Sequence, residues 1–262
     1  MQLDSLLLYL ATGAVSGLAA GLFGVGGGLI IVPALAGLLS YQGGAAAMQT
    51  AIATSLAVMC LTSISSMRAH NGRGGVLWPV FWRLAPGIVI GSLLGATVAQ
   101  GLGGTTLRRV IGCGALLIAL QLLIDAKPKV VRSLPGSAGL ASVGAVIGAL
   151  SALIGIGGGS LTVPYLAHRG VEMRQAVGTS SACGVPIAWA GTLAFALGGL
   201  GVPGRPAFSL GYVDLTAFIG IAAMSVLTAP LGARLAHRWP QRTLKRAFGV
   251  FLTFIGVRML WF

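Results

Sequence analysis

The chain has 262 residues, of which 56% are hydrophobic and 8% are charged, and its formal net charge at pH 7 is +13. A soluble domain usually contains about 25% charged residues, so this chain has too few polar side chains to cover a water-facing surface. We therefore interpret it as an integral membrane protein. The positive charge then fits lysines and arginines in cytoplasmic loops. The sequence contains no basic stretch that is interleaved with aromatic side chains, so it does not indicate nucleic-acid binding.

Hydrophobic runs predict an all-α polytopic fold with about five helical elements in each half of the chain. The second element of each half covers only about 13 and 9 residues, whereas a helix needs about 20 to cross a bilayer. We expect these two elements to be short or re-entrant helices that follow a glycine break. The elements lie near residues 5–23, 28–40, 49–66, 76–98 and 107–124, and near 136–154, 159–167, 175–198, 211–233 and 246–262.

The two halves share three sequence segments in the same order. Residues 24–33 read GVGGGLIIVP and residues 155–164 read GIGGGSLTVP. Two further pairs follow, 51–55 with 176–180 and 107–112 with 244–249. Such matches at a fixed order indicate a duplicated unit, which is common among secondary transporters. We predict two transmembrane repeats, residues 1–131 and residues 132–262.

The distribution of lysine and arginine predicts how these repeats are oriented. If the first two elements of each half both cross or both turn back, twelve basic residues face one side and three face the other. Counting only one of the two elements as crossing spreads the same residues over both sides. The positive-inside rule therefore favours an odd number of crossings in each half. This predicts inverted repeats, cytoplasmic basic loops and both termini outside.

The repeated glycine run predicts an anion site. Each glycine costs about 1 kcal/mol relative to alanine in a helix, so the run should unwind where it is buried in protein or lines a cavity. The short helix that follows then begins with free amides and a positive dipole end, which together bind anions. The alternative is close helix packing without a ligand. The candidate binding residues are Gly26, Gly27 and Gly28 in the first half and Gly157, Gly158, Gly159 and Ser160 in the second.

Hydroxyl side chains follow the glycine run at matching places in both halves. Thr54 and Ser55 belong to the first half, and Thr179 and Ser180 belong to the second. Their hydroxyls can donate hydrogen bonds to anionic oxygens without adding a buried charge, so we add them to the candidate site. The alternative is that they bond the carbonyl one turn back in their own helix.

The remaining polar residues indicate no catalytic chemistry. Ser160 lies beside glycine amides, but a serine hydrolase needs a base within reach, and the three histidines lie in or near loops. No histidine, cysteine and acid cluster has metal-ligand spacing, and no phosphate-binding loop of the Walker type is present. We therefore expect no enzyme activity, no metal and no cofactor.

A few individual residues carry expectations about their surroundings. We expect Asp214, at the start of a span, to lie among lipid headgroups. We expect His70 to be solvated beside arginines. The cysteines have no framework spacing, and core packing accounts for Cys60, Cys113 and Cys183.

On these motifs the chain resembles the TauE/SafE sulfite exporter family, also called the toluene sulfonate uptake permease family. The family signature is GxGGG-xxxxP with a downstream A-x-x-T-S element in each half, and the resemblance covers essentially the whole chain. It implies transport of sulfur-containing anions such as sulfite, thiosulfate or sulfoacetate across a bacterial inner membrane. Two residues depart from the family pattern: Leu77 stands where an acid is common, although Asp214 keeps it in the second half, and Ser160 replaces a bulky apolar residue.

We therefore predict a secondary transporter that moves a small sulfur-containing anion by alternating access. An anion channel built on the same site, or a membrane scaffold that transports nothing, are the alternatives. Gly91 and Gly95 form a small-xxx-small face that packs helices within the chain or between chains of a homo-oligomer.

Overall fold

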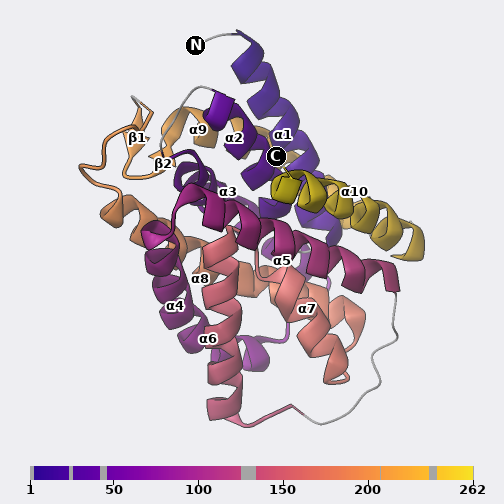
Figure 1. The fold of residues 1–262 in the computed structure, drawn as a ribbon. Helices are drawn as coiled ribbons and strands as arrows, with labels where there is room; N and C mark the ends of the chain where they lie inside the picture. Colours follow the sequence, from indigo (N-terminus) through magenta and orange to yellow (C-terminus); the bar gives the residue numbers. More distant parts are fainter. Residues whose placement is uncertain are drawn as a thin grey trace.

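The computed structural model describes residues 3–23, 26–41, 46–124, 134–206, 208–235 and 241–261, which form ten helices and one small hairpin (Figure 1). The first half contributes α1 (Leu3–Phe23), α2 (Gly28–Tyr41), α3 (Ala47–Asn71), α4 (Trp78–Gly101) and α5 (Gly104–Ile124). The second half contributes α6 (Ser137–Ile154), α7 (Gly159–His168), α8 (Met173–Gly198), β1 (Ser209–Leu210), β2 (Val213–Asp214), α9 (Leu215–Leu235) and α10 (Gln241–Trp261).

Six of these helices are long and apolar enough to cross a membrane: α1, α3, α4, α6, α8 and α9. Each half supplies three of them, at the first, third and fourth places in its order of helices. The prediction of an all-α polytopic membrane fold is confirmed.

The two short helices begin at the glycine runs, as the sequence predicts. Helix α2 has 14 residues and α7 has 10. Each contains a proline at its sixth position, Pro33 or Pro164. Because proline has no N–H group, each short helix lacks the hydrogen bond that this residue would donate one turn back.

The expectations for three side chains are wrong. Asp214 is only 4% exposed, and its Oδ1 accepts hydrogen bonds from the amides of Thr216 (2.9 Å) and Ala217 (3.1 Å). It therefore caps α9, which begins after the β1–β2 hairpin and not at residue 211 as predicted. His70 is also buried, at 4% exposed, whereas Cys113 is exposed. Hydrophobic runs locate helices along the chain, but they do not say which face of a helix its neighbours cover.

Helices from different halves pack closely in parallel pairs. Helix α4 packs on α6, and α1 packs on α9. In both pairs the residue numbers rise together along the contact, so the helices run in the same direction. The glycine face of α4 is therefore used inside the chain, and it is not available for packing a second copy. The contacts join Gly87, Gly91 and Gly95 to Ala141, Ala145 and Ala149, and Gly13 and Gly17 to Ile221 and Ser225.

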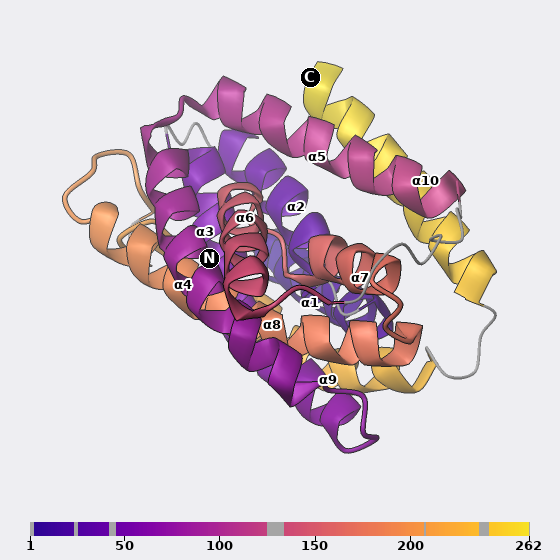
Figure 2. The same cartoon turned by 90° about the horizontal axis from the view of Figure 1, so that it is seen from below.

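The corresponding third helices, α3 and α8, contact each other in antiparallel orientation. Ser66 of α3 lies against Ser181 of α8, while Cys60, about two turns earlier in α3, lies against Thr192, about three turns later in α8. The last helices of the halves, α5 and α10, also run antiparallel and side by side, and Figure 2 shows them along one edge of the molecule.

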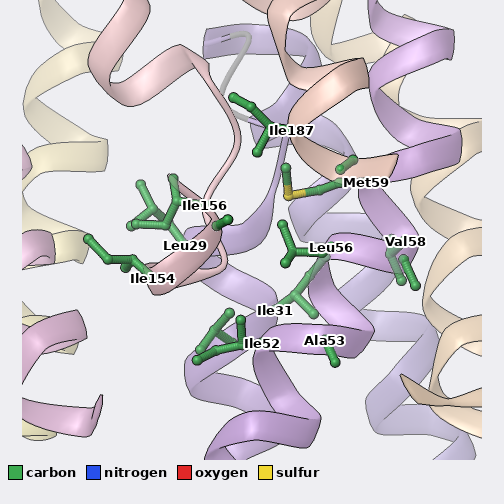
Figure 3. Close-up of a cluster of buried hydrophobic side chains, with 14 of the residues drawn as sticks. Leu29, Ile31, Ile52, Ala53, Leu56, Val58, Met59, Ile154, Ile156 and Ile187 are labelled. Carbon is green, nitrogen blue, oxygen red and sulfur yellow. The ribbon is translucent and has the colours of Figure 1, made fainter. Parts of the chain in front are cut away.

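An apolar cluster surrounds the short helices at the centre of the fold. Side chains from α2, α3, the segment between α6 and α7, and α8 meet there (Figure 3). This cluster fixes the positions of the two glycine runs, because both runs lie directly beside it. It includes Leu29, Ile31, Ile52, Leu56, Met59, Ile154, Ile156 and Ile187.

Candidate functional site

The two glycine runs, 131 positions apart in the sequence, meet in the folded chain. A Cβ atom on Gly26 would lie 3.2 Å from the Cα atom of Gly157. A Cβ atom on Gly28 would overlap the carbonyl oxygen of Gly155. The backbones can therefore approach this closely only because these residues lack side chains. Close packing, the alternative in the sequence, is thus part of what the glycines do.

Left-handed backbone turns precede both short helices. The φ angles are 77° at Gly26 and 81° at Gly27, and the φ angle at Gly155 is 74°. L-residues with a side chain rarely adopt this conformation. Gly155 ends α6 by donating its amide to the carbonyl of Ser151, and the chain can then reverse into α7.

The short helices leave their first amides available at the meeting point. In α2 the first helical hydrogen bonds run from Ile30 and Ile31 to the carbonyl of Gly27 (3.0 and 3.2 Å). In α7 the corresponding bonds run from Leu161 and Thr162 to the carbonyl of Gly158 (3.3 and 2.7 Å). The amides that precede them have no acceptor within their own helix. Together with the helix dipole, they favour an anion.

Thr54 and Thr179 form matching hydrogen bonds between the two halves. Thr54 Oγ1 accepts from the amide of Asp214 at the start of α9, and Thr179 Oγ1 accepts from the amide of Leu77 at the start of α4, both at 2.9 Å. Leu77 and Asp214 thus occupy corresponding places, as the family pattern indicates. A hydroxyl that accepts a hydrogen bond still has its own proton to donate, so both threonines keep one donor.

The serines of the candidate site differ in what they contact. Ser55 Oγ donates to the carbonyl of Gly155 at 3.1 Å and so joins the two halves. Ser180 Oγ donates to the carbonyl of Val177 at 2.9 Å, the local bond considered as the alternative. Ser160 Oγ donates to the carbonyl of Gly157 at 3.3 Å.

All the candidate residues are buried, and the structure brings both glycine runs together with the two threonine–serine pairs of α3 and α8. Among the described residues, no group of three or more histidine, cysteine or acidic side chains could hold a metal ion. The buried candidates are Gly26, Gly27, Gly28, Thr54, Ser55, Gly157, Gly158, Gly159, Ser160, Thr179 and Ser180.

Three further hydroxyls of α3 lie on the same helix as Thr54 and were missed by the sequence reasoning. Thr62 Oγ1 lies 3.1 Å from Ser225 Oγ, and Ser66 Oγ donates to Ser181 Oγ at 3.2 Å. Ser63 lies against Gly184 of α8, because a Cβ atom on Gly184 would be 2.9 Å from Ser63 Oγ. The signal was present in the sequence, because hydroxyls three and four positions apart share one helix face.

Comparison with known proteins identifies the family of the chain. The Sulfite exporter TauE/SafE family matches residues 9–259 of the chain. The chain belongs to this family. Its membership fits the paired glycine runs and short helices on which the fold is centred. No solved structure matches the chain.

Two relatives match the chain along nearly their whole length. A probable membrane transporter protein of Haemophilus influenzae is 36% identical over 258 residues, which cover 97% of both chains. A probable membrane transporter protein of Methanocaldococcus jannaschii is 25% identical over 258 residues, covering 97% of this chain and 94% of the relative. With its six apolar helices, this family member is a multi-pass membrane protein.

Proposed function

We propose that this TauE/SafE family member is a secondary transporter of small sulfur-containing anions such as sulfite, thiosulfate or sulfoacetate. The observation that carries the proposal is the meeting of two glycine runs, each of which begins a short helix. Two helix N-termini then offer amide donors at one buried place. The family and the names of its relatives support transport as the activity.

The chemistry of the site fits an oxyanion. Amide and hydroxyl groups donate hydrogen bonds without bringing in a full positive charge, so the ligand is held without a permanent ion pair that would slow its release. Thr54 and Thr179 each retain a proton to donate after accepting from a helix start. A sulfonate or sulfite group offers several oxygens and can accept from more than one donor at a time.

We further propose that residues 1–131 and 132–262 are inverted repeats and that transport occurs by alternating access around the glycine runs. The antiparallel contacts of α3 with α8, and of α5 with α10, support inversion, because corresponding helices of the two halves then point in opposite directions. The basic loops would face the bacterial cytoplasm, with both termini outside. Cysteine labelling of intact cells at residues 72 and 205 tests this, since a reagent that cannot cross membranes should reach only residue 205.

Thermal stabilisation of the purified protein tests anion binding. A ligand that binds the native state raises its melting temperature by mass action. The panel is sulfite, thiosulfate, sulfoacetate, sulfate, chloride and acetate. We expect a rise with at least one sulfur anion and a smaller rise in Gly158→Ala, whose new Cβ atom would crowd the start of α7, 3.0 Å from Ile187 Cδ1 and 3.4 Å from the amide nitrogen of Gly184. Gly37→Ala is the control, because nothing lies within 4 Å of its Cβ position.

Transport itself is tested in proteoliposomes loaded with the anion that gives the largest shift. A transporter gives saturable counterflow, in which unlabelled anion inside drives uptake of labelled anion from outside. Large unitary currents would instead show the channel alternative. No stabilisation by any anion, in a protein that melts cooperatively, would contradict the proposed site and favour the scaffold alternative.

A further inference from the structure

One face of α4 is exposed along the whole helix. Helices α6 and α8 pack on the other side of α4, and its glycines lie against α6 (Figure 1). The exposed positions recur every three or four residues, which places them on a single face of the helix. Because α4 is long and apolar enough to cross a membrane, this face meets lipid. It runs from Trp82 and Arg83 through Ile90 and Leu94 to Thr97.

Arg83 is the only charged residue of α4, and it lies on this exposed face. It is the sixth residue of the helix, about 7.5 Å along the axis from the first residue, Trp78. A charged side chain at this depth is unfavourable unless it pairs with another group or extends to the headgroup region. Among the residues that the structure describes, none forms a hydrogen bond or an ion pair with Arg83. Its guanidinium N–H donors are therefore available to an acceptor from the membrane.

Three aromatic rings lie beside Arg83 at the start of α4. The ring centroids of Trp78 and Phe81 are 5.4 Å apart, and those of Phe81 and Trp82 are 5.0 Å apart. Trp78 Nε1 donates a hydrogen bond to Asn71 Oδ1 at 3.0 Å. Trp82 is 66% exposed, and within the described ranges its Nε1 atom donates to no acceptor. Because tryptophan is enriched at headgroup level, the start of α4 offers two donors, the Trp82 indole and the Arg83 guanidinium, at that depth.

The corresponding helix of the other half lacks both donors. The matching threonine contacts at the starts of α4 and α9 pair Trp82 with Ile219 and Arg83 with Gly220. Ile219 is 65% exposed and so faces outward as Trp82 does, but it carries no polar group. With the inverted orientation proposed above, the start of α4 faces the cytoplasmic leaflet and the start of α9 faces the outer one. The cytoplasmic leaflet carries the negative surface potential of anionic lipids.

We propose that Trp82 and Arg83 bind the headgroup of an anionic phospholipid, with the guanidinium and the indole N–H donating hydrogen bonds to its phosphate oxygens. Arginine binds phosphate through two parallel hydrogen bonds, which fixes the headgroup in one orientation. Charge complementarity favours an anionic lipid, because a zwitterionic headgroup carries its own ammonium group beside the phosphate. The site lies on the outer face of α4 and is separate from the glycine runs. Only the choice of leaflet rests on the proposed orientation, and the lipid site does not depend on which anion is transported.

Native mass spectrometry of the full chain in detergent tests the proposal by measuring Kd for the first bound lipid. Phosphatidylglycerol is the anionic probe, and phosphatidylethanolamine is the zwitterionic one. Wild-type protein should bind phosphatidylglycerol more tightly. Arg83→Ala should raise Kd for phosphatidylglycerol about fivefold and bring the two lipids to similar affinity. Trp82→Phe keeps the ring but loses the N–H donor, so it should raise that Kd about threefold.

Arg109→Ala is the matched control. Like Arg83, Arg109 is exposed and is the sixth residue of its helix, α5. No aromatic residue lies within one turn of it in the sequence. Its removal lowers the net charge of +13 by the same amount as the removal of Arg83. Kd for phosphatidylglycerol should nevertheless stay within about twofold of wild type.

Three outcomes would overturn the lipid site. Equal affinity of wild-type protein for the two lipids would show that the headgroup charge is not recognised. An equal loss of affinity in Arg83→Ala and Arg109→Ala would show general attraction by the net charge instead of a site. Glycerol phosphate that binds as tightly as phosphatidylglycerol would identify a free phosphate as the ligand. Melting of each variant without lipid verifies that the variants remain folded, and none of these results bears on anion transport.

Discussion

Replacing Thr54 by valine should destabilise the fold although the two side chains have almost the same shape. Thr54 Oγ1 is the acceptor for the amide of Asp214 at 2.9 Å, and both residues are buried. Valine removes the acceptor and leaves that amide without a partner away from water. A buried N–H group left unsatisfied costs about 1–3 kcal/mol, so we expect a loss of this size in the free energy of unfolding.

The corresponding change in the other half provides an internal comparison. Thr179→Val removes the acceptor of the Leu77 amide, also at 2.9 Å. Leu77 is only partly buried, so solvent or lipid headgroups can compensate and the loss should be smaller. Thr97→Val is the control, because Thr97 is exposed and its hydroxyl bonds only a carbonyl of its own helix. It should change stability by no more than about 0.5 kcal/mol.

The assay is unfolding by sodium dodecyl sulfate in mixed micelles, followed by circular dichroism. The expected order of destabilisation is Thr54→Val, then Thr179→Val, then Thr97→Val. A Thr54→Val variant that is no less stable than Thr97→Val would refute the reasoning, since the hydrogen bond between the halves would then contribute nothing measurable.

Three further predictions use the same unfolding assay. Gly91→Ala should cost about 1–3 kcal/mol, because its Cβ atom would overlap the backbone of Ala145. The control Gly101→Ala, with nothing within 4 Å of its Cβ position, should be nearly neutral. Equal effects would contradict the close α4–α6 contact. Asp214→Ala should cost about 1 kcal/mol and speed hydrogen exchange in the first turn of α9. Asp214→Asn keeps an acceptor and should cost less. Unchanged hydrogen exchange in the alanine variant would count against the cap. Gly155→Ala should cost at least about 1 kcal/mol, because φ is 74° there, and a neutral result would contradict the need for glycine at this turn.

Much of the fold could be predicted because it depends on local pattern. Hydrophobic runs located ten helices, and the glycine runs marked the starts of α2 and α7. The small error at α9 came from the β1–β2 hairpin, whose residues continue the apolar run into the helix. A strand of two residues has too short a pattern to be recognised in sequence.

The candidate site was predicted in part. Both glycine runs and both threonine–serine pairs are buried near one another. Ser180 makes the local bond that was the alternative, whereas the other three hydroxyls bond groups in the opposite half. Thr54 and Thr179 accept from helix starts in the opposite half, and Ser55 bonds the opposite glycine run. Ser63 was overlooked because its neighbour Gly184 lies 121 positions later in the sequence and contacts it only in the folded chain.

The sequence by itself determined the class of the protein, its helices and the two places where helices must break, since apolar content, period and glycine runs act over a few residues. It also predicts the duplication. Only the tertiary structure decided which helices pair, and that Asp214 and His70 are buried while Cys113 is exposed. The α4–α6 and α1–α9 contacts, for example, join residues more than 50 positions apart. Such contacts are determined by how whole helices pack, and no local pattern encodes that.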